Sequence, residues 1–231
     1  MKIILFDIDG TLISTDGCGC VAMNRAYSEL FGLKNALDGV LVAGSTDAAI
    51  TANVFQRFEI SWNTEHVDRL KHLYLSYLLE ELEDEKWRKY LLPGLPCVLD
   101  ELRMCSAVQL GLLTGNWREG ARIKLSYFGL WNYFPFGAFG DDHHDRNQLL
   151  PFALRRMQSR QDSPIDHHRV FVIGDTPRDI QCGRPYNAVT IAVATGPYSI
   201  ECLRNEDPHF VLPNLANVKD LLGIVRDHDV V

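Results

Sequence analysis

The sequence lacks long apolar runs and has no surplus of positive charge. The segment before Asp7 is too short for the apolar core of a signal peptide, and no other run approaches the length that crosses a bilayer. The 23 lysine and arginine residues are outnumbered by 30 aspartate and glutamate residues, for a net charge of −7, so the chain has no general attraction for nucleic acid or anionic membranes. We therefore expect a cytoplasmic protein, monomeric or homodimeric, with no nucleic-acid or membrane partner.

The cysteines and histidines also lack the spacing of a disulfide framework or a zinc site. One Cys-x-Cys pair has no second pair, and two His-His pairs, at 143–144 and 167–168, have no third ligand spaced to join them. Surface or loop positions are the simpler interpretation of these histidines, although the first pair lies beside Arg146 and a substrate contact there stays open. We expect six free thiols in a reducing compartment, at Cys18, Cys20, Cys97, Cys105, Cys182 and Cys202.

Short apolar runs alternate with helical patterns along most of the chain. The runs, which are typical of strands buried on both faces, cover residues 2–8, 107–113, 170–173, 189–194 and, more weakly, 210–212. Helical patterns separate or follow them at 95–104, 118–127, 149–157, 177–184 and 216–225. This alternation predicts an α/β fold with a doubly wound parallel sheet, a Rossmann-like core.

One section breaks the alternation and contains helical patterns only. A helix predicted over 21–31 ends at Gly32, a residue suited to a helix C-terminus, and apolar residues keep helical spacing over 67–82. Between these two patterns, Thr46 can begin a helix over 47–58. We predict a catalytic core made of residues 1–16 and 91–231, with a helical domain of residues 17–90 inserted after the first strand.

Polar residues follow three of the predicted strands. Residues 7–11 (DIDGT) end the first, residues 114–116 (TGN) follow the second, and residues 174–179 (GDTPRD) follow the third. In an open parallel sheet these ends lie at one edge, where ligands bind. Crowded carboxylates repel one another and need a cation, and a site rich in oxygen ligands suits Mg²⁺. One carboxylate can then be a nucleophile that forms an aspartyl-phosphate, and a second can be a general acid.

These motifs resemble those of the haloacid dehalogenase-like hydrolases, a superfamily that includes many phosphatases. The resemblance implies that Asp7 is the nucleophile, that Asp9 is the acid and base, and that the Thr114 hydroxyl holds the phosphoryl group. It also implies a Mg²⁺ cofactor, bound by Asp7, by the backbone carbonyl of Asp9, and by the fourth motif with Asp175 and Asp179. The helical insertion resembles the cap of the phosphoglycolate phosphatase and β-phosphoglucomutase branch.

The third motif of this superfamily is a lysine or arginine that pairs with the phosphoryl oxygens and the nucleophile. In this branch it is usually a lysine that opens KPxPxP before a helix. Here residues 145–151 read DRNQLLP, and Pro151 falls where one of those prolines would fall, which assigns Arg146 to the basic position. The rival candidates are Lys124 and Arg122, in the helix after the second motif, and we expect both to be solvated surface charges.

Some of these residues have a structural interpretation as well. Thr176 and Asp179 have the spacing of a capping box, with Pro177 at the first helical position. Asp7 has the weakest structural alternative, because a carboxylate that ends an apolar strand is costly without a partner or a cation.

The candidate substrate contacts have alternatives too. Asn116 stands three residues before Glu119, so its side chain can cap the helix that follows, which is the interpretation we favour for it. Thr46 can cap its own helix, but in the branch that the chain resembles a cap loop closes over the site, and then Thr46 or Asp47 would touch the substrate. The candidate substrate-binding residues are Gly115, Asn116 and Thr46.

The function that we expect is hydrolysis of a small phosphorylated metabolite, phosphoglycolate-like, with Mg²⁺ as cofactor. A sugar-phosphate mutase of the same superfamily is the alternative. A dehalogenase is disfavoured, because displacing a halide needs neither Mg²⁺ nor a second aspartate, and Asp9, Asp175 and Asp179 are all present. A binding module without activity would normally lose one essential residue, whereas here all the core positions are filled.

Overall fold

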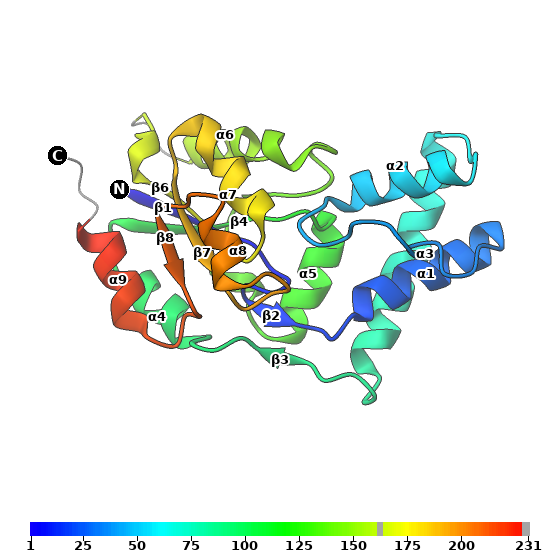
Figure 1. Cartoon of the computed structure of the whole chain (residues 1–231), viewed down its shortest axis with the longest axis horizontal. Helices are drawn as coiled ribbons and strands as arrows, with labels where there is room; N and C mark the ends of the chain where they lie inside the picture. Colours follow the sequence, from blue (N-terminus) through cyan, green and yellow to red (C-terminus); the bar gives the residue numbers. More distant parts are fainter. Residues whose placement is uncertain (161–163, 228–231) are drawn as a thin grey trace.

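The computed structural model, which describes residues 1–160 and 164–227, is built on a parallel six-stranded sheet (Figure 1). The strand order is β5-β4-β1-β6-β7-β8, and every neighbouring pair is parallel. The predicted parallel sheet is therefore confirmed. Its strands are β1 (Lys2–Phe6), β4 (Val108–Leu113), β5 (Gly137–Ala138), β6 (Val170–Gly174), β7 (Val189–Val193) and β8 (Phe210–Leu212).

Helices cover both faces of this sheet, as a doubly wound fold requires. Successive side chains of a strand point to opposite faces, and β1 accordingly sends Ile4 and Phe6 into one hydrophobic cluster and Ile3 and Leu5 into another. The first cluster is closed by α4 (Cys97–Met104), α5 (Arg118–Tyr127) and α9 (Val218–Asp227). The other face is covered by α6 (Leu150–Gln158), α7 (Pro177–Gly183) and α8 (Ile200–Arg204).

Three further helices lie to one side of the sheet, at the right of Figure 1: α1 (Cys18–Phe31), α2 (Asp47–Arg57) and α3 (Thr64–Glu83). They share a hydrophobic cluster of their own, to which Tyr27, Phe55, Leu70 and Tyr74 contribute. Gly32 ends α1 as predicted, because its φ of 68° is readily adopted only by glycine, and its N–H donates to Ser28 O.

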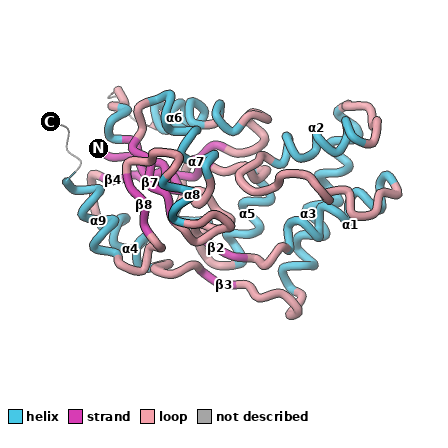
Figure 2. Tube along the Cα trace, in the orientation of Figure 1, coloured by secondary structure: helices cyan, strands magenta, loops and turns pink. Residues whose placement is uncertain are grey.

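The chain enters and leaves these three helices through two short strands, β2 (Ile13–Ser14) and β3 (Tyr90–Leu91), which pair with each other in antiparallel fashion. Figure 2 shows that the part of the chain beyond this pair consists of helices and loops. The predicted boundary at residues 16–17 falls just after β2, and the one at residues 90–91 falls within β3. The division into a core and an inserted cap domain stays a prediction.

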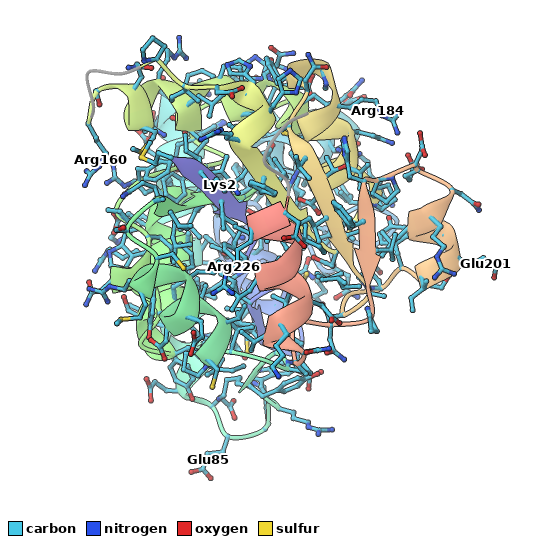
Figure 3. The ribbon with its side chains drawn as sticks, turned by 90° about the vertical axis from the view of Figure 1, so that its left-hand side faces the viewer. Lys2, Glu85, Arg160, Arg184, Glu201 and Arg226 are labelled. Atoms are coloured by element: carbon cyan, nitrogen blue, oxygen red, sulfur yellow. The ribbon has the colours of Figure 1, made fainter. Side chains whose placement is uncertain are left out.

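The opposite end of β1 is anchored by its own lysine. Lys2 Nζ donates to the carbonyls of Val225 and Arg226, the latter at 3.1 Å, so its charge meets the C-terminal end of α9 (Figure 3). This fixes β1 at the end of the sheet that is remote from Asp7. Among the described residues, no helix has both the length and the apolar character needed to cross a bilayer.

Candidate active site

The residues that directly follow β1, β4 and β6 open into one space. Because β1 lies between the other two strands, Asp7, Thr114 and Asp175 come together at the same edge of the sheet. They line a cavity of about 530 Å³, whose opposite wall comes from the helical insertion. Of the other candidate residues, the cavity is also lined by Asp9, Gly115, Asn116 and Arg146.

Asp7, Asp175 and Asp179 form a buried acidic cluster. One carboxylate oxygen of each lies within 4.8 Å of the others. Burial raises the pKa of Asp7 to about 6, although the charge of Arg146 opposes this shift. Burial, followed by the negative charge of Asp7, also raises the pKa of Asp175 well above its ordinary value. The cluster therefore concentrates negative charge in a site with little access to water.

Two glycines let the Asp175 carboxylate enter this cluster. A Cβ atom on Gly10 would lie 2.3 Å from Asp175 Oδ2, and one on Gly196 would lie 1.7 Å from the same atom. Gly10 also has a φ of +82°, which other residues rarely adopt. Next to it, Thr11 donates its hydroxyl hydrogen to Asp175 Oδ1 at 2.9 Å. Gly10 of the first motif therefore leaves room for the Asp175 carboxylate of the fourth motif, and Thr11 hydrogen-bonds to it.

Arg146 is the cation of the acidic cluster. It lies in a 3₁₀ turn just before α6, is 3% exposed, and approaches Asp7 Oδ1 to 3.0 Å while it also pairs with Asp179. Its guanidinium further donates to Leu113 O, at the end of β4. The structure therefore places Arg146 beside Asp7, as the sequence assignment of the third motif predicted. Arg122, in contrast, is half exposed and pairs with Glu119 on the surface.

Asp179 takes part in the capping box and in the acidic cluster at once. Its Oδ2 accepts from the N–H of Thr176 at 3.0 Å and from the Thr176 hydroxyl at 2.7 Å, which closes the predicted box at the start of α7. Its Oδ1 pairs with Arg146. The two interpretations of this motif are therefore compatible, and both oxygens of Asp179 already have partners.

The prediction that Lys124 is a solvated surface charge is wrong. Lys124 is 5% exposed, and its Nζ donates to both carboxylate oxygens of Asp9, at 2.9 and 2.7 Å, and to Asn116 Oδ1 at 2.8 Å. The negative charge of Asp9 raises the pKa of this buried ammonium group, against the opposing effect of burial. A sequence signal existed, because Lys124 follows Ala121 by three residues and therefore lies on the apolar face of α5.

The predicted capping by Asn116 is also wrong. Helix α5 begins at Arg118, and its N-cap residue is Trp117, whose side chain makes no capping hydrogen bond. Its first turn is instead met by carboxylates from distant segments: the N–H of Trp117 donates to Asp47 Oδ2 at 2.7 Å, and that of Arg118 donates to Asp141. The Asn116 side chain is free to turn into the cavity, where its amide N–H donates to Asp9 Oδ2 at 2.8 Å.

The loop before α2 rests directly on the second motif. The N–H of Asp47 donates to Gly115 O at 2.8 Å, and a Cβ on Gly115 would lie 2.1 Å from Ser45 O, so only glycine permits this contact. Thr46 caps α2 through its hydroxyl, which also donates to His144 O at 2.6 Å. Thr46 is fully buried and does not line the cavity, so the structure supports its capping role and does not place it against a substrate.

The histidine pairs take no part in the cavity lining. His143 is half-buried and His144 exposed, with their rings stacked 4.5 Å apart. His167 and His168 lie in an exposed turn before β6. These placements agree with the surface or loop interpretation.

The acidic cluster fits a hard divalent cation. Asp7 Oδ1 is buried and accepts no hydrogen bond from any described residue, although it lies within ion-pair distance of Arg146. A buried charged oxygen in this state is costly unless a ligand meets it. The donors gathered around it are carboxylate oxygens, which Mg²⁺ prefers over nitrogen or sulfur.

A comparison with protein-family models adds a decisive match. The model described as haloacid dehalogenase-like hydrolase matches residues 4–193, a span that contains all three strand ends and Arg146. The chain belongs to the haloacid dehalogenase-like hydrolases. The predicted family and the prediction of a hydrolytic enzyme are both confirmed.

Curated relatives of this hydrolase match it along its whole length at low identity. The phosphoglycolate phosphatase of Aquifex aeolicus (strain VF5) is 24% identical over 233 residues, which cover 100% of this chain and 99% of that protein. The pyrophosphatase PpaX of Bacillus pumilus (strain SAFR-032) is 24% identical over 227 residues, covering 96% and 95%.

Solved structures of this family share its fold. A hydrolase from Pseudomonas syringae superposes with a TM-score of 0.70 at 19% identity, over 97% of this chain and 99% of that one. A β-phosphoglucomutase from Clostridium difficile reaches a TM-score of 0.71 at 14% identity, over 99% and 98%. A predicted phosphatase from Clostridium acetobutylicum has a TM-score of 0.70 at 18% identity, over 96% and 98%, close to the value for the mutase, so the fold does not separate these two activities.

Proposed function

We propose that the protein is a magnesium-dependent phosphatase that hydrolyses a small phosphorylated metabolite through an aspartyl-phosphate on Asp7. The observation that carries the proposal is the Asp7 carboxylate itself. It follows β1 at the floor of the cavity, it is buried, and its Oδ1 accepts no hydrogen bond from the described residues. Arg146, 3.0 Å away, supplies positive charge where a phosphoryl group would lie. The curated relatives, a phosphoglycolate phosphatase and a pyrophosphatase, support this reaction class.

The Mg²⁺ ion would be held by Asp7, Asp175 and the backbone carbonyl of Asp9, with Asp179 beside them. When bound, the ion neutralises the acidic cluster and the charge of the phosphoryl oxygens. Because both oxygens of Asp179 are already paired with Arg146 and Thr176, we propose that Asp179 acts mainly by keeping Arg146 in place.

In the first step, a carboxylate oxygen of Asp7 attacks the phosphorus atom and the bond from phosphorus to the leaving oxygen breaks. Asp9 gives its proton to that oxygen, so the product leaves as a neutral alcohol. The Thr114 hydroxyl and the backbone of Gly115 lie at the end of the neighbouring strand and would bind the phosphoryl oxygens.

In the second step, water attacks the phosphorus atom and Asp9 takes up the proton that water loses, so phosphate leaves and Asp7 is regenerated. Both carboxylate oxygens of Asp9 accept hydrogen bonds from Lys124, and Oδ2 also accepts one from Asn116. To serve as the acid of the first step, Asp9 must carry a proton, which it would regain from the water of the second step. We therefore assign Lys124 as a positioning residue for Asp9.

Residues 17–90 would be the cap domain that covers this site. The contacts of Asp47 with Gly115 and of Thr46 with His144 correspond to a closed arrangement. The six cysteines are unpaired, which supports the cytoplasmic location that we propose. A sugar-phosphate mutase stays the alternative, because it would use the same residues on the same fold.

Acid quenching during turnover tests the proposal. With a ³²P-labelled phosphomonoester and Mg²⁺, the wild-type protein should carry label on the peptide that contains Asp7. Asp7→Asn should carry none and should lose activity by a factor on the order of 10³ or more, because an amide has nearly the same shape but is a poor nucleophile. The matched control is Asp68→Asn, an exposed aspartate on α3, which should label and turn over normally. Phosphate release by Asp7→Asn at the normal rate, in correctly folded protein, would exclude this mechanism.

A further inference from the structure

The cavity has two walls of different chemistry. The wall beside the sheet edge carries Asp7, Asp9 and Asp175 and two cations, Lys124 and Arg146. The wall from the helical insertion contributes no lysine, arginine or histidine among the described residues, and most of its side chains are apolar. These apolar side chains are Cys20, Met23, Leu37, Val42, Ala43, Ile50 and the ring of Tyr74.

Both cations of the cavity are already neutralised by aspartates. Arg146 pairs with Asp7 and Asp179, and Lys124 donates to both carboxylate oxygens of Asp9. Neither is therefore available as an uncompensated positive charge for a second anionic group of the substrate. A carboxylate or second phosphate buried without a cation or a set of donors is strongly disfavoured.

The far side of the cavity adds negative charge rather than positive. Asp47 and Asp16 belong to the lining, and Asp47 is 8% exposed with its carboxylate directed at the N–H of Trp117. A second anionic group on the substrate would therefore meet repulsion as well as desolvation.

Two further basic side chains, those of Lys71 and Arg178, do not line the cavity. Lys71 pairs with Asp141. Arg178 packs its Cβ and Cδ atoms close to Gly44, at the end of the loop that precedes α2, and does not line the cavity. Neither of them supplies charge to the apolar wall in this arrangement.

We propose that the substrate is a phosphomonoester of an uncharged, largely apolar alcohol, whose body packs against the wall formed by Met23, Leu37, Val42 and Ile50. This inference rests on the proposed phosphatase function and narrows it. A volume of about 530 Å³ lies within the range of about 300–1,000 Å³ of sites for drug-sized ligands. The inferred substrate class excludes a phosphoglycolate-like acid, pyrophosphate, and the bisphosphate that a mutase would turn over, because each carries a second anionic group.

The test compares two esters that differ by one charge, pentyl phosphate and 5-phosphonooxypentanoate. With Mg²⁺, the wild-type protein should hydrolyse pentyl phosphate with a kcat/KM at least about tenfold higher, since losing one hydrogen bond to a charged group already amounts to about that factor. Phosphoglycolate and pyrophosphate should be poorer still. An equal or higher kcat/KM for any of the three substrates that carry a second anionic group would overturn the inference.

A charge placed on the apolar wall should reverse this preference. Val42 is half-buried and lines the cavity, so Val42→Arg adds a cation there at small risk to the fold, and Val42→Leu is the matched neutral control. Val42→Arg should raise the ratio of kcat/KM for 5-phosphonooxypentanoate over pentyl phosphate at least about tenfold, whereas Val42→Leu should leave it as in the wild type. A folded Val42→Arg protein with an unchanged ratio would show that substrates do not contact this wall.

Different results would contradict the substrate inference and the phosphatase proposal. If the wild-type protein hydrolyses the esters and labels Asp7 but prefers the charged one, the substrate inference fails and the phosphatase proposal stands. If it hydrolyses none of them, nor any other phosphomonoester, the phosphatase proposal fails. Should Val42→Arg not fold, the wild-type comparison decides, together with inhibition by pentylphosphonate against 5-phosphonopentanoate, where the neutral chain should bind at least about tenfold more tightly.

Discussion

Two buried cations serve the two aspartates of the first motif, and the charge around them differs. Arg146 stands in a cluster of three carboxylates, whereas the ammonium group of Lys124 is hydrogen-bonded to one carboxylate, that of Asp9. With all groups ionised, the Arg146 cluster has an excess of two negative charges, and the Lys124 pair is neutral. From this difference we expect the Arg146 side to need a divalent cation and the Lys124 side to need none.

The largest expected effect is the loss of activity when divalent cations are removed. Chelation should abolish phosphate release and added Mg²⁺ should restore it. Mg²⁺ at about 100 times its dissociation constant should also stabilise the folded protein by about 2.7 kcal/mol, measured by thermal unfolding. Asp175→Asn should lose most of this stabilisation, whereas Lys124→Met should keep it, because it leaves the acidic cluster of Asp7, Asp175 and Asp179 intact. Full activity after exhaustive chelation would show that the acidic cluster around Arg146 needs no divalent cation.

Removing the cation of the acidic cluster should have the next largest effect. Arg146→Ala should lower kcat/KM by about 10²–10³, the scale of losing one preorganised charge contact. Arg146→Lys should recover part of this, because lysine keeps the charge without the forked geometry. Arg122→Ala, on an exposed side chain of α5, is the control and should resemble the wild type.

The outcome also decides the third motif. A near-normal Arg146→Ala protein together with an inactive Lys124→Ala or Arg122→Ala protein would show that the motif has been assigned to the wrong residue. Because Arg146 is buried between carboxylates, its alanine variant should also lose about 3–5 kcal/mol of stability, measured by denaturant unfolding.

Removing the cation on the other side should have a smaller effect. Lys124→Met should lower kcat by about tenfold to hundredfold with little change in KM. This is less than the 10²–10⁴ that general acid–base catalysis typically contributes, because Asp9 is still present and Asn116 still holds it. Lys34→Met, on an exposed lysine, is the control. An unchanged kcat in folded Lys124→Met would remove the positioning role of Lys124.

The smallest effect concerns the contact between the insertion and α5. Burial raises the pKa of Asp47 to about 6, with the positive charge of Lys124 opposing the shift. An aspartate of the unfolded chain ionises near pH 4, so between about pH 4 and pH 6 the folded state holds the extra proton and stability falls as pH rises. Asp47→Asn should remove up to about 3 kcal/mol of this fall in the free energy of unfolding. If the free energy of unfolding changed with pH equally in Asp47→Asn and the wild type, this prediction would be wrong.

Local patterns were sufficient for the residues that end strands. Asp7, Thr114 and Asp175 each follow an apolar run, and a run buried on both faces of a parallel sheet must end at the edge where the other runs end. Arg146 was assigned through the resemblance to the family's third motif, because Pro151 falls where one of that motif's prolines would fall. The helix Arg118–Tyr127 was also predicted at its observed bounds, whereas β5 (Gly137–Ala138) was missed because two small residues carry no strand pattern.

The sequence by itself determined the parallel sheet and the three strand-end motifs, because each depends on neighbouring residues and on the fixed geometry of a strand. The cation beside Asp7 was assigned through the resemblance to the family's third motif. Only the tertiary structure decided the partners of Asp9. Helical spacing places Lys124 on the same face as Ala121, but its contact with Asp9 depends on how α5 packs against the first motif. Asn116 reaches Asp9 because Asp47, 70 residues away along the chain from Trp117, meets the helix start in its place. Contacts over such separations depend on how whole elements pack, and no short sequence pattern encodes that packing.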